Sequence, residues 1–308
     1  MNMFGFSVAD LPAPPLERLL ELAQETGYRG LELRSGPGET VHLDLDRAGR
    51  QQIAAAFDRA GVSLLGLVTS LDVTAPGEDG QLLAELRRHI WLAADVGARY
   101  LRVLPCGADT GGSGSGVRAE RRLRAVASLA ATCGVRILLQ TQDAQDSVGQ
   151  VAGLLDRIGA AGVGAFWDVQ GSPEQGGDLP RAYARLASHL GFIQVHGNQV
   201  HGDQARQGQA HEGLGEPPAA EGTVPDATST SAADCTAGPP ELRAALRTAV
   251  DNGYDGWFVW KYDARRPPQP DGFAPALAAG RDWLERTTSA SRSGRARRRS
   301  KVGANAAH

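Results

Sequence analysis

The chain has 308 residues, with 32 basic and 35 acidic side chains and 42% hydrophobic residues. This length and apolar content fit one large α/β barrel or two ordinary domains. No apolar run reaches the roughly 20 residues that a membrane-spanning helix needs. The first fifteen residues lack the basic and apolar regions of a signal peptide, so we expect a cytoplasmic protein without a membrane partner.

The net charge of −3 hides an uneven distribution. Residues 287–308 contain five arginines and one lysine but no acidic residue, which leaves a body with a net charge of about −9. An acidic body is a poor surface for nucleic acid, so we expect no specific nucleic-acid partner. The composition of residues 287–308 is typical of a disordered basic tail.

The three cysteines, Cys106, Cys133 and Cys235, are odd in number and form no CxxC motif. This pattern argues against both a disulfide framework and a structural zinc site.

Apolar strands alternate with amphipathic helices through most of the chain. The expected strands, in chain order, are 3–8, 30–34, 62–68, 100–104, 135–139, 163–167, 191–195 and 257–260. The expected helices are 15–26, 47–60, 81–96, 117–132, 147–158, 179–188, 241–252 and 275–286.

Eight strand–helix units with a spacing of roughly 30 residues predict parallel strands with helical crossovers. We therefore expect a single (β/α)₈ TIM barrel over residues 1–286. A doubly wound sheet usually has a glycine-rich phosphate turn after its first strand, and residues 6–10 contain none. The run Gly111–Gly116 lacks the Gly-Lys-Ser/Thr ending of a phosphate loop, so we interpret it as a flexible loop at the barrel mouth. Residues 197–240, rich in glycine, proline and serine, are interpreted as a long loop or insertion.

Polar residues gather where the last four expected strands end. In a TIM barrel these carboxyl ends carry the chemistry, and alternate side chains point into the mouth. The residues expected there are Gln140, Gln142, Asp168, Gln170, Gln194, His196, Asn198 and Lys261. A set of this size on neighbouring strands favours a binding site over chance contact with solvent.

Lys261 stands out because the chain contains only two lysines, and the other, Lys301, belongs to the basic tail. It follows the apolar strand Trp257–Trp260. A buried lysine is costly unless it is paired or its pKa falls, and such lysines act as bases or Schiff-base nucleophiles. The alternative is a lysine that extends from a strand end to solvent.

Several phrases, in their order and spacing, resemble the xylose-isomerase-like TIM barrels, and in particular the sugar phosphate isomerase/epimerase family. They are Gly27–Leu33, Ala94–Tyr100, Trp167-Asp168, Val195-His196 and Gly253–Trp257, and the resemblance covers the chain from Phe4 to Arg286. It implies a sugar-like small-molecule substrate and one divalent metal held by Glu, Asp, His and Glu at the ends of strands five to eight. The two glutamates of the family also move the substrate proton.

This chain departs from that pattern at both glutamate positions. Asp168 and His196 match the family's Asp and His, whereas Gln140 and Lys261 stand in place of the two glutamates. Gln140 cannot titrate, and a hard cation binds poorly when carboxylates are lost. An ammonium at ~4 Å from a cation costs roughly 4 kcal/mol at an effective dielectric near 20. We therefore expect no cofactor and disfavour Mn²⁺, Mg²⁺, Co²⁺ or Zn²⁺, with Asp168 and His196 as remnants of the metal site.

The sequence leads to a sugar isomerase/epimerase-like enzyme in which Lys261, His196 and Asp168 are catalytic. Lys261 would act either as a fixed cation and acid/base group or as a Schiff-base nucleophile with lyase- or aldolase-like chemistry. Substrate binding is assigned to Gln140, Gln142, Gln170, Asn198, Glu32 and Arg34. Arg34 and Arg102 are candidates for holding an anionic group.

Two alternatives stay open. The first is a catalytically silent barrel that binds a ligand or partner, because an amide-rich mouth can hydrogen-bond a polyol without reacting with it. The second is a metal enzyme that takes new ligands from His201, His211 and Glu212 on the long loop. Assembly into a homo-oligomer is left open as well.

Overall fold

The structure is a computed structural model that describes residues 2–9, 14–104, 114–141, 145–169, 179–197, 240–261 and 273–304. The side chains of residues 145–147 and 290–304 lie outside this description.

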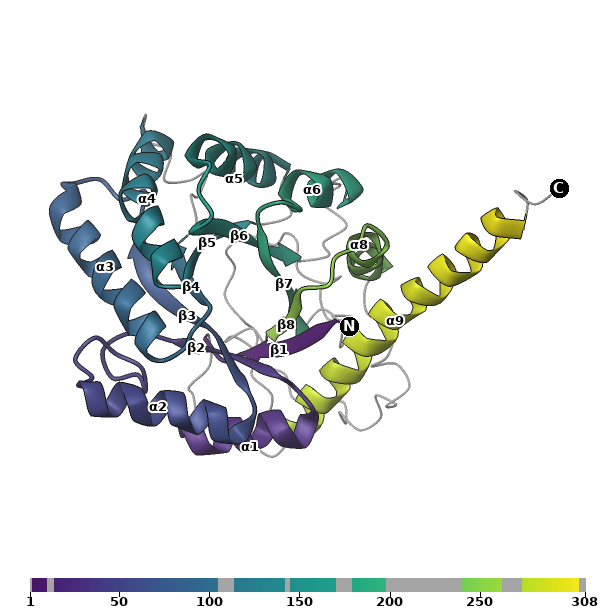
Figure 1. The fold of residues 1–308 in the computed structure, drawn as a ribbon, viewed down its shortest axis with the longest axis horizontal. Helices are drawn as coiled ribbons and strands as arrows, with labels where there is room; N and C mark the ends of the chain where they lie inside the picture. Colours follow the sequence, from purple (N-terminus) through teal and green to yellow (C-terminus); the bar gives the residue numbers. More distant parts are fainter. Residues whose placement is uncertain are drawn as a thin grey trace, which may run out of the picture.

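Parallel strands close into a barrel in chain order, because β1 pairs with both β2 and β8 (Figure 1). The strands are β1 (Met3–Ser7), β2 (Gly30–Arg34), β3 (Ser63–Asp72), β4 (Tyr100–Leu104), β5 (Arg136–Thr141), β6 (Val163–Val169), β7 (Leu190–His196) and β8 (Trp257–Lys261). The predicted (β/α)₈ TIM barrel is therefore confirmed.

Helices surround this barrel as an outer ring (Figure 1). They are α1 (Leu16–Thr26), α2 (Arg47–Ala60), α3 (Asp79–Asp95), α4 (Ser115–Thr132), α5 (Gln145–Ile158), α6 (Leu179–Leu186), α8 (Pro240–Asp251) and α9 (Phe273–Ala304). Helix α9 contacts α1 and α8 and so completes the ring beside the last strand.

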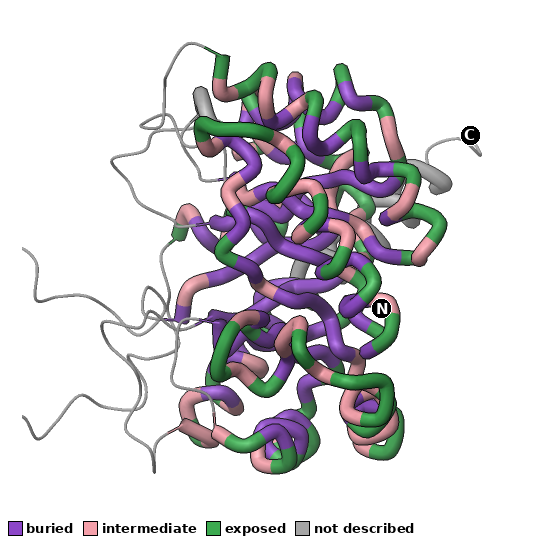
Figure 2. Tube along the Cα trace, turned by 90° about the vertical axis from the view of Figure 1, so that its left-hand side faces the viewer, coloured by how far each residue is buried: buried purple, intermediate pink, exposed green. Residues whose placement is uncertain are grey.

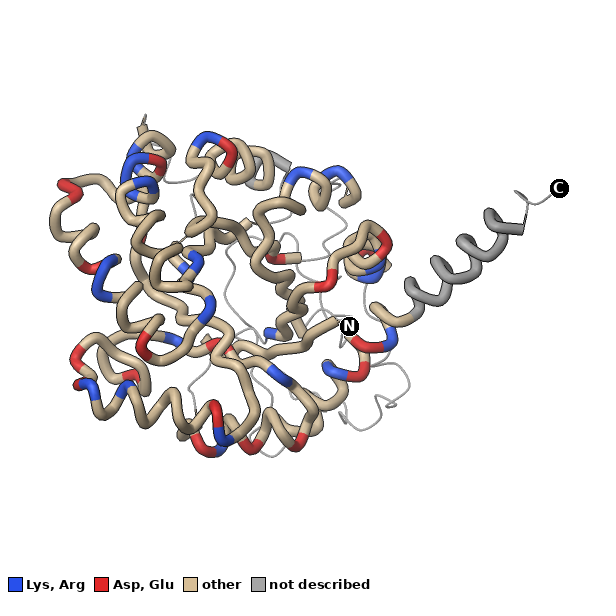
Figure 3. The backbone as a smooth tube through the Cα atoms, viewed as in Figure 1, with Lys and Arg blue, Asp and Glu red and all other residues tan. Residues whose placement is uncertain are grey.

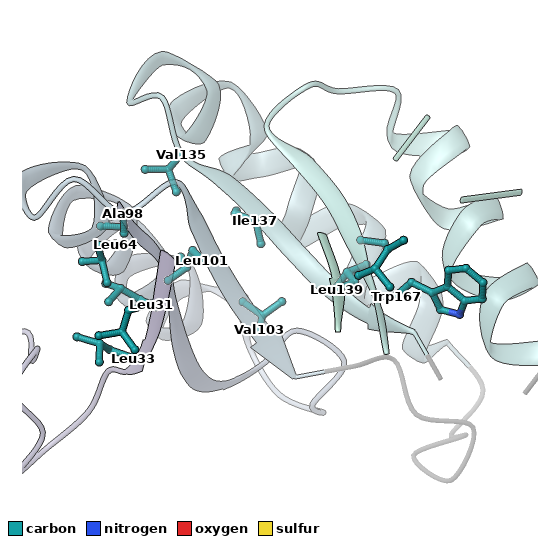
Figure 4. Packing of buried hydrophobic residues seen from close by; sticks show 14 of the residues in the cluster. Leu31, Leu33, Leu64, Ala98, Leu101, Val103, Val135, Ile137, Leu139 and Trp167 are labelled. Atoms are coloured by element: carbon teal, nitrogen blue, oxygen red, sulfur yellow. The ribbon is translucent and has the colours of Figure 1, made fainter. Parts of the chain in front are cut away.

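The main core lies between the strands and the helices. Side chains on the outer faces of the strands, such as Leu31, Leu101, Ile137 and Trp167, are fully buried there (Figure 4). Burial between the strands and the helices explains why most outward positions of the strands are apolar. Figure 2 shows the same division, with buried strands inside and exposed positions mostly on the helices. Charged residues are likewise concentrated on the helices (Figure 3).

Local signals define where the helices begin and end. The side chain of Asp46 accepts a hydrogen bond of 2.7 Å from the backbone N–H of Gly49 and caps the start of α2. Helices α1 and α2 end at Gly27 and Gly61, whose φ angles of 74° and 64° lie in the left-handed region that favours glycine.

A second apolar cluster fills the inside of the barrel and forms what we call the floor. It comprises Leu65, Leu138, Phe166, Phe192, Trp257 and Val259. Phe166 and Phe192 stack with 5.0 Å between ring centroids. Gly30 leaves room for the Trp257 indole, because a Cβ at this glycine would lie 2.6 Å from the ring. With period-two alternation, the next inward positions along the strands lie above this floor, at the carboxyl ends.

Helix α9 continues to Ala304, and Thr287 and Thr288 at the start of the predicted basic tail are buried. Alanine and arginine have high helix propensity, so a helix anchored on the barrel can extend through such residues. The disorder predicted for residues 287–308 stays a prediction.

Candidate active site at the barrel mouth

The inward positions above the floor hold a connected group of polar side chains from five strands. This polar cluster consists of Glu32 (β2), Arg102 (β4), Gln140 (β5), Asp168 (β6), and Gln194 and His196 (β7). On β5, β6 and β7 these residues lie two or four positions after a floor residue of the same strand. Such spacings place side chains on the same side of a strand, so the polar cluster points into the barrel like the floor.

Asp168 lies at the centre of this polar cluster and is 1% exposed. Its Oδ1 accepts a hydrogen bond of 2.6 Å from His196 Nε2, and its Oδ2 accepts one of 2.6 Å from Gln140 Nε2. Both carboxylate oxygens are thus engaged by neighbouring strands. A charge buried to this extent is tolerated only because donors surround it.

The pKa of Asp168 results from opposing effects. Burial raises it, but the hydrogen bond and charge of His196, with the positive charges of Lys261 and Arg102, lower it by more. The pKa therefore lies below the usual range of an aspartic acid, and the group is a carboxylate at neutral pH.

An ionised Asp168 fixes the tautomer of His196. A carboxylate only accepts hydrogen bonds, so the short contact requires the imidazole proton on Nε2. Gln194 Nε2, at 3.5 Å from the same ring nitrogen, is then a weak contact and not a donor to it. In the neutral ring, Nδ1 is left as the nitrogen that can take up a proton.

Arg102 anchors the other half of the polar cluster. Its Nη1 donates to Glu32 Oε2 at 2.7 Å and to Gln194 Oε1 at 3.1 Å. The guanidinium also lies over the Phe166 ring, 3.9 Å from the centroid, in the geometry of a cation–π contact. Arg102 therefore connects β2 with β7 and rests on the floor.

Glu32 has one oxygen without a hydrogen-bond partner within the described residues, although the residue is fully buried. An orphaned buried carboxylate oxygen is costly, and this distinguishes the atom from the oxygens of Asp168, which both accept hydrogen bonds.

Lys261 ends β8 beside the polar cluster and is 8% exposed. Its register partners are His196 on β7 and Ser7 on β1. Its positive charge acts on Asp168 and helps to lower the pKa of that carboxyl. The sequence-predicted lysine thus lies at the mouth, next to both predicted partners.

The structure brings together the catalytic candidates Lys261, His196 and Asp168, with Gln140 beside them. Arg34, two positions after Glu32 on β2, forms an ion pair of 2.7 Å with Glu39, and its side chain is 42% exposed. The remaining predicted binding residues lie outside the described part of the chain, as do the alternative ligands on the long loop; these are Gln142, Gln170, Asn198, His201, His211 and Glu212.

The pairing of Arg102 with Glu32 is a feature that the sequence did not predict. The two residues lie on β2 and β4, which are not neighbours in the sheet. The only available signal was that each is a charged residue between apolar neighbours on its strand.

The donor set does not favour a metal ion at this point of the barrel. Among the described residues, no group of three or more His, Cys, Asp or Glu side chains is arranged to hold one. Asp168 and His196, the two family-type ligands, use their facing atoms on each other. The nearby charges of Lys261 and Arg102 would also repel a cation.

The model of one protein family, the xylose isomerase-like TIM barrels, matches residues 20–287. The chain belongs to this family. None of the curated proteins matches the chain in sequence.

Solved structures with the same fold include several sugar epimerases. An L-ribulose 3-epimerase aligns with a TM-score of 0.68 at 16% identity, covering 96% of this chain and 97% of its own. D-psicose 3-epimerase from Clostridium cellulolyticum H10 aligns with a TM-score of 0.61 at 14% identity, covering 94% and 97%. A xylose isomerase domain protein from Alicyclobacillus acidocaldarius aligns with a TM-score of 0.62 at 19% identity, covering 95% and 100%. At these identities the similarity establishes the fold alone.

Within the described residues, no helix is long and apolar enough to cross a bilayer.

Proposed function

We propose that this family member is a sugar isomerase/epimerase-like enzyme that acts on a polyhydroxy carbonyl compound without a catalytic metal. The observation that carries the proposal is the Asp168–His196 hydrogen bond of 2.6 Å beside the buried Lys261. Sugar epimerases among the similar structures support the reaction class.

The proposed chemistry uses the imidazole as acid and base. His196, with its proton held on Nε2 by Asp168, takes the proton from the substrate carbon next to the carbonyl through Nδ1. The C–H electron pair forms the carbon–carbon double bond of an enediolate, and the negative charge moves to the carbonyl oxygen. Return of the proton to the former carbonyl carbon, together with movement of a hydroxyl proton to the other oxygen, completes an isomerisation. A proton added by the Lys261 ammonium to the opposite face of the original carbon completes an epimerisation.

Lys261 supplies the positive charge that this step requires. An ammonium fixed near the developing oxyanion stabilises the transition state more than the ground state, because the charge appears only as the proton leaves. In this scheme Lys261 takes the electrostatic role that a divalent cation would otherwise perform. The lyase- or aldolase-like alternative uses the same residue as a Schiff-base nucleophile.

The metal-independent scheme fits the donor set. The family's metal chemistry would need carboxylates where Gln140 and Lys261 stand, and the oxygens of Asp168 are occupied by Gln140 and His196. No step of the proposed reaction passes through a metal. Binding of Mn²⁺ or Zn²⁺ through residues outside the described part of the chain is the competing scheme.

A silent binding barrel is the second candidate, and one observation favours it. The charged groups of the polar cluster largely satisfy one another, as in the Arg102–Glu32 pair and the two donors to Asp168. Side chains that already hydrogen-bond one another can hold the hydroxyl groups of a sugar without taking part in a reaction.

Proton exchange separates these candidates directly. D-tagatose, D-fructose and L-ribulose are incubated with the protein in D₂O, and ¹H NMR follows the loss of the hydrogen next to the carbonyl. We expect exchange that survives chelator treatment, falls at least about 100-fold in Lys261→Met, and is unchanged in Lys301→Met, the matched change at the other lysine.

Other results of the exchange experiment would support one of the alternative schemes. Absence of exchange with all three sugars supports the silent barrel, provided that the sugars bind. Loss of exchange with a chelator, and its return with Mn²⁺ or Zn²⁺, contradicts the metal-independent scheme. A borohydride-trapped adduct on Lys261, located by mass spectrometry, establishes the Schiff-base version.

A further inference from the structure

The side-chain amide of Gln194 lies between the two halves of the polar cluster. Gln194 and His196 are two positions apart on β7, so their side chains point to the same side of the strand. The amide oxygen Oε1 lies 3.1 Å from Arg102 Nη1, and the amide nitrogen Nε2 lies 3.5 Å from His196 Nε2. Gln194 is fully buried, so its protein neighbours determine which way the amide points.

Arg102 determines the orientation of this amide. A guanidinium only donates hydrogen bonds, so the atom of Gln194 that faces it is the oxygen. A flipped amide would place its own N–H groups against those of the guanidinium and would lose this hydrogen bond. With the oxygen held by Arg102, the nitrogen of the amide is the atom that faces the imidazole of His196.

Arg102 is itself held on two sides. The same Nη1 that faces Gln194 donates to Glu32 Oε2 at 2.7 Å, and both members of this ion pair are buried. The guanidinium also rests on the Phe166 ring, 3.9 Å from its centroid. Arg102 cannot turn away from Gln194 without leaving the buried carboxylate of Glu32 unpaired, which is costly.

The orientation of the amide matters because of the proton on His196 Nε2. This proton is donated to Asp168 Oδ1 at 2.6 Å. In a flipped amide, Gln194 Oε1 would lie about where the nitrogen lies now, 3.5 Å from the same ring nitrogen. It would then be a second acceptor for the proton and would compete with Asp168 for the imidazole.

We propose that Arg102 is a positioning residue, which holds the Gln194 amide with its nitrogen towards His196 so that the imidazole donates its Nε2 proton to Asp168 alone. The consequence for turnover rests on the proposed function, in which His196 acts on the substrate through Nδ1. The consequence for the ring is present in the resting protein and does not depend on any reaction.

The experiment removes the ion pair and the amide separately and together. Removing Arg102 alone would leave the buried charge of Glu32 unpaired, so both are replaced by apolar residues, a change that proteins often tolerate. This pair-deleted variant carries Arg102→Met and Glu32→Leu. Gln194→Met removes the amide with a side chain of similar size, and a triple variant carries all three changes.

NMR of the resting protein gives the first readout. The proton on His196 Nε2 resonates far downfield when a carboxylate accepts it in a short, charge-assisted hydrogen bond. In the pair-deleted variant we expect this resonance to move upfield, because the amide turns and its oxygen competes with Asp168. In Gln194→Met and in the triple variant we expect a resonance close to that of the wild type, because no amide is left to compete.

Proton exchange on the three ketoses gives the second readout. We expect the pair-deleted variant to exchange about 10- to 100-fold more slowly than the wild type, because the ring is no longer held in one position. Gln194→Met added to that variant should restore most of the lost rate. Gln194→Glu presents an oxygen on both sides, so it should reproduce the defect with Arg102 in place, and it serves as the test if the pair-deleted variant fails to fold.

Arg136→Met is the matched control. Arg136 is a partly buried arginine at the start of β5, at the end of the barrel opposite the mouth, and it donates to the carbonyls of Val163 and Leu190. Its replacement removes an arginine and two hydrogen bonds from the barrel, but it should leave the His196 Nε2 resonance and the exchange rate unchanged.

Two outcomes overturn the proposal. The first is a His196 Nε2 resonance that stays at its wild-type position in the pair-deleted variant, or in Gln194→Glu if that variant is used. The second is a defect that Gln194→Met does not reverse, which would assign the effect of Arg102 to its charge and not to the amide. Failure of the proposed function is distinguishable from both: the expected NMR shifts in a protein without proton exchange remove the chemistry and leave the positioning role.

Discussion

Asp168 Oδ1 and His196 Nε2 are 2.6 Å apart and join β6 to β7 at the barrel mouth. The carboxylate is buried and ionised, and it determines which ring nitrogen carries the proton. Replacing the carboxylate by an amide tests this relationship. In Asp168→Asn the ring loses the partner that requires a proton on Nε2, so we expect the other tautomer to become populated and proton exchange to fall about 10³- to 10⁴-fold. Long-range ¹H–¹⁵N NMR of His196 reports the tautomer, and an unchanged tautomer contradicts the assignment.

Restoring glutamates at positions 140 and 261 tests whether the missing negative charge is what weakens metal binding at this site. The double change Gln140→Glu and Lys261→Glu adds two negative charges around Asp168 and removes one positive charge, a net change of −3 relative to the present chain. At roughly 4 kcal/mol per close pair, this is expected to tighten Mn²⁺ binding by a factor on the order of 100 or more. Calorimetry checks the affinity, with Gln140→Glu alone as the intermediate case. Equal Mn²⁺ affinity in wild type and the double variant would contradict the expectation.

Two adjacent arginines share the carboxylate of Asp79 but differ in burial. Arg122 is 1% exposed and also donates to the carbonyls of Val73, Ala75 and Gly77, whereas the Arg121 side chain is 58% exposed. Arg122→Leu leaves these buried carbonyls unpaired and should lower the free energy of unfolding by about 3 kcal/mol or more. Arg121→Leu removes an exposed ion pair and should cost less than about 1 kcal/mol. Urea unfolding of the two variants measures the difference, and equal costs would refute the role assigned to Arg122.

Asp79 also gives the protein an acid-sensitive contribution to stability. The hydrogen bonds from Arg121, and then from Arg122, lower its pKa from 3.8 to about 2. Because the folded-state pKa is below the unfolded one, the stabilisation is complete above about pH 4 and is lost as the pH falls towards 2. The destabilisation caused by Asp79→Asn should therefore shrink over this range, as followed by urea unfolding at several pH values. A destabilisation by Asp79→Asn that stays constant between pH 4 and pH 2 would contradict this linkage.

Gly162 allows α4 to approach the start of β6. A Cβ at this position would lie 2.1 Å from the carbonyl oxygen of Ala127, a backbone atom that cannot move alone. Gly162→Ala should therefore destabilise the protein by about 2 kcal/mol or more. Gly116, within α4, has no atom near its added Cβ, so Gly116→Ala should stabilise by about 0.5–1 kcal/mol through helix propensity. Thermal unfolding of the pair measures both signs.

The architecture and part of the mouth could be predicted from the sequence because they depend on local patterns. Period-two alternation places Gln140, Asp168, His196 and Lys261 on inward positions of successive strands, and closure of the barrel then brings them together. The family resemblance added the expectation of a metal-type Asp and His. Their direct hydrogen bond depends on side-chain geometry that no sequence spacing specifies.

The contacts that the sequence does not predict are tertiary ones. The pairing of Arg102 with Glu32 joins two strands that are not neighbours in the sheet. The position of Arg34 at a strand end predicts substrate binding, and its side chain forms an ion pair with the nearby Glu39. Neither contact leaves a periodic signal, because each depends on how the folded chain brings distant side chains together.

The floor of the barrel separates the part of the chain that specifies the fold from the part that specifies the reaction. Leu65, Phe166, Phe192 and Trp257 close the barrel interior with apolar side chains, so we expect new charges above them to leave strand pairing intact. A lineage with this arrangement can exchange a glutamate for a lysine, or the reverse, without first acquiring a compensating change in the core. The same independence makes the mouth of this barrel a suitable place for directed evolution of new carbonyl chemistry.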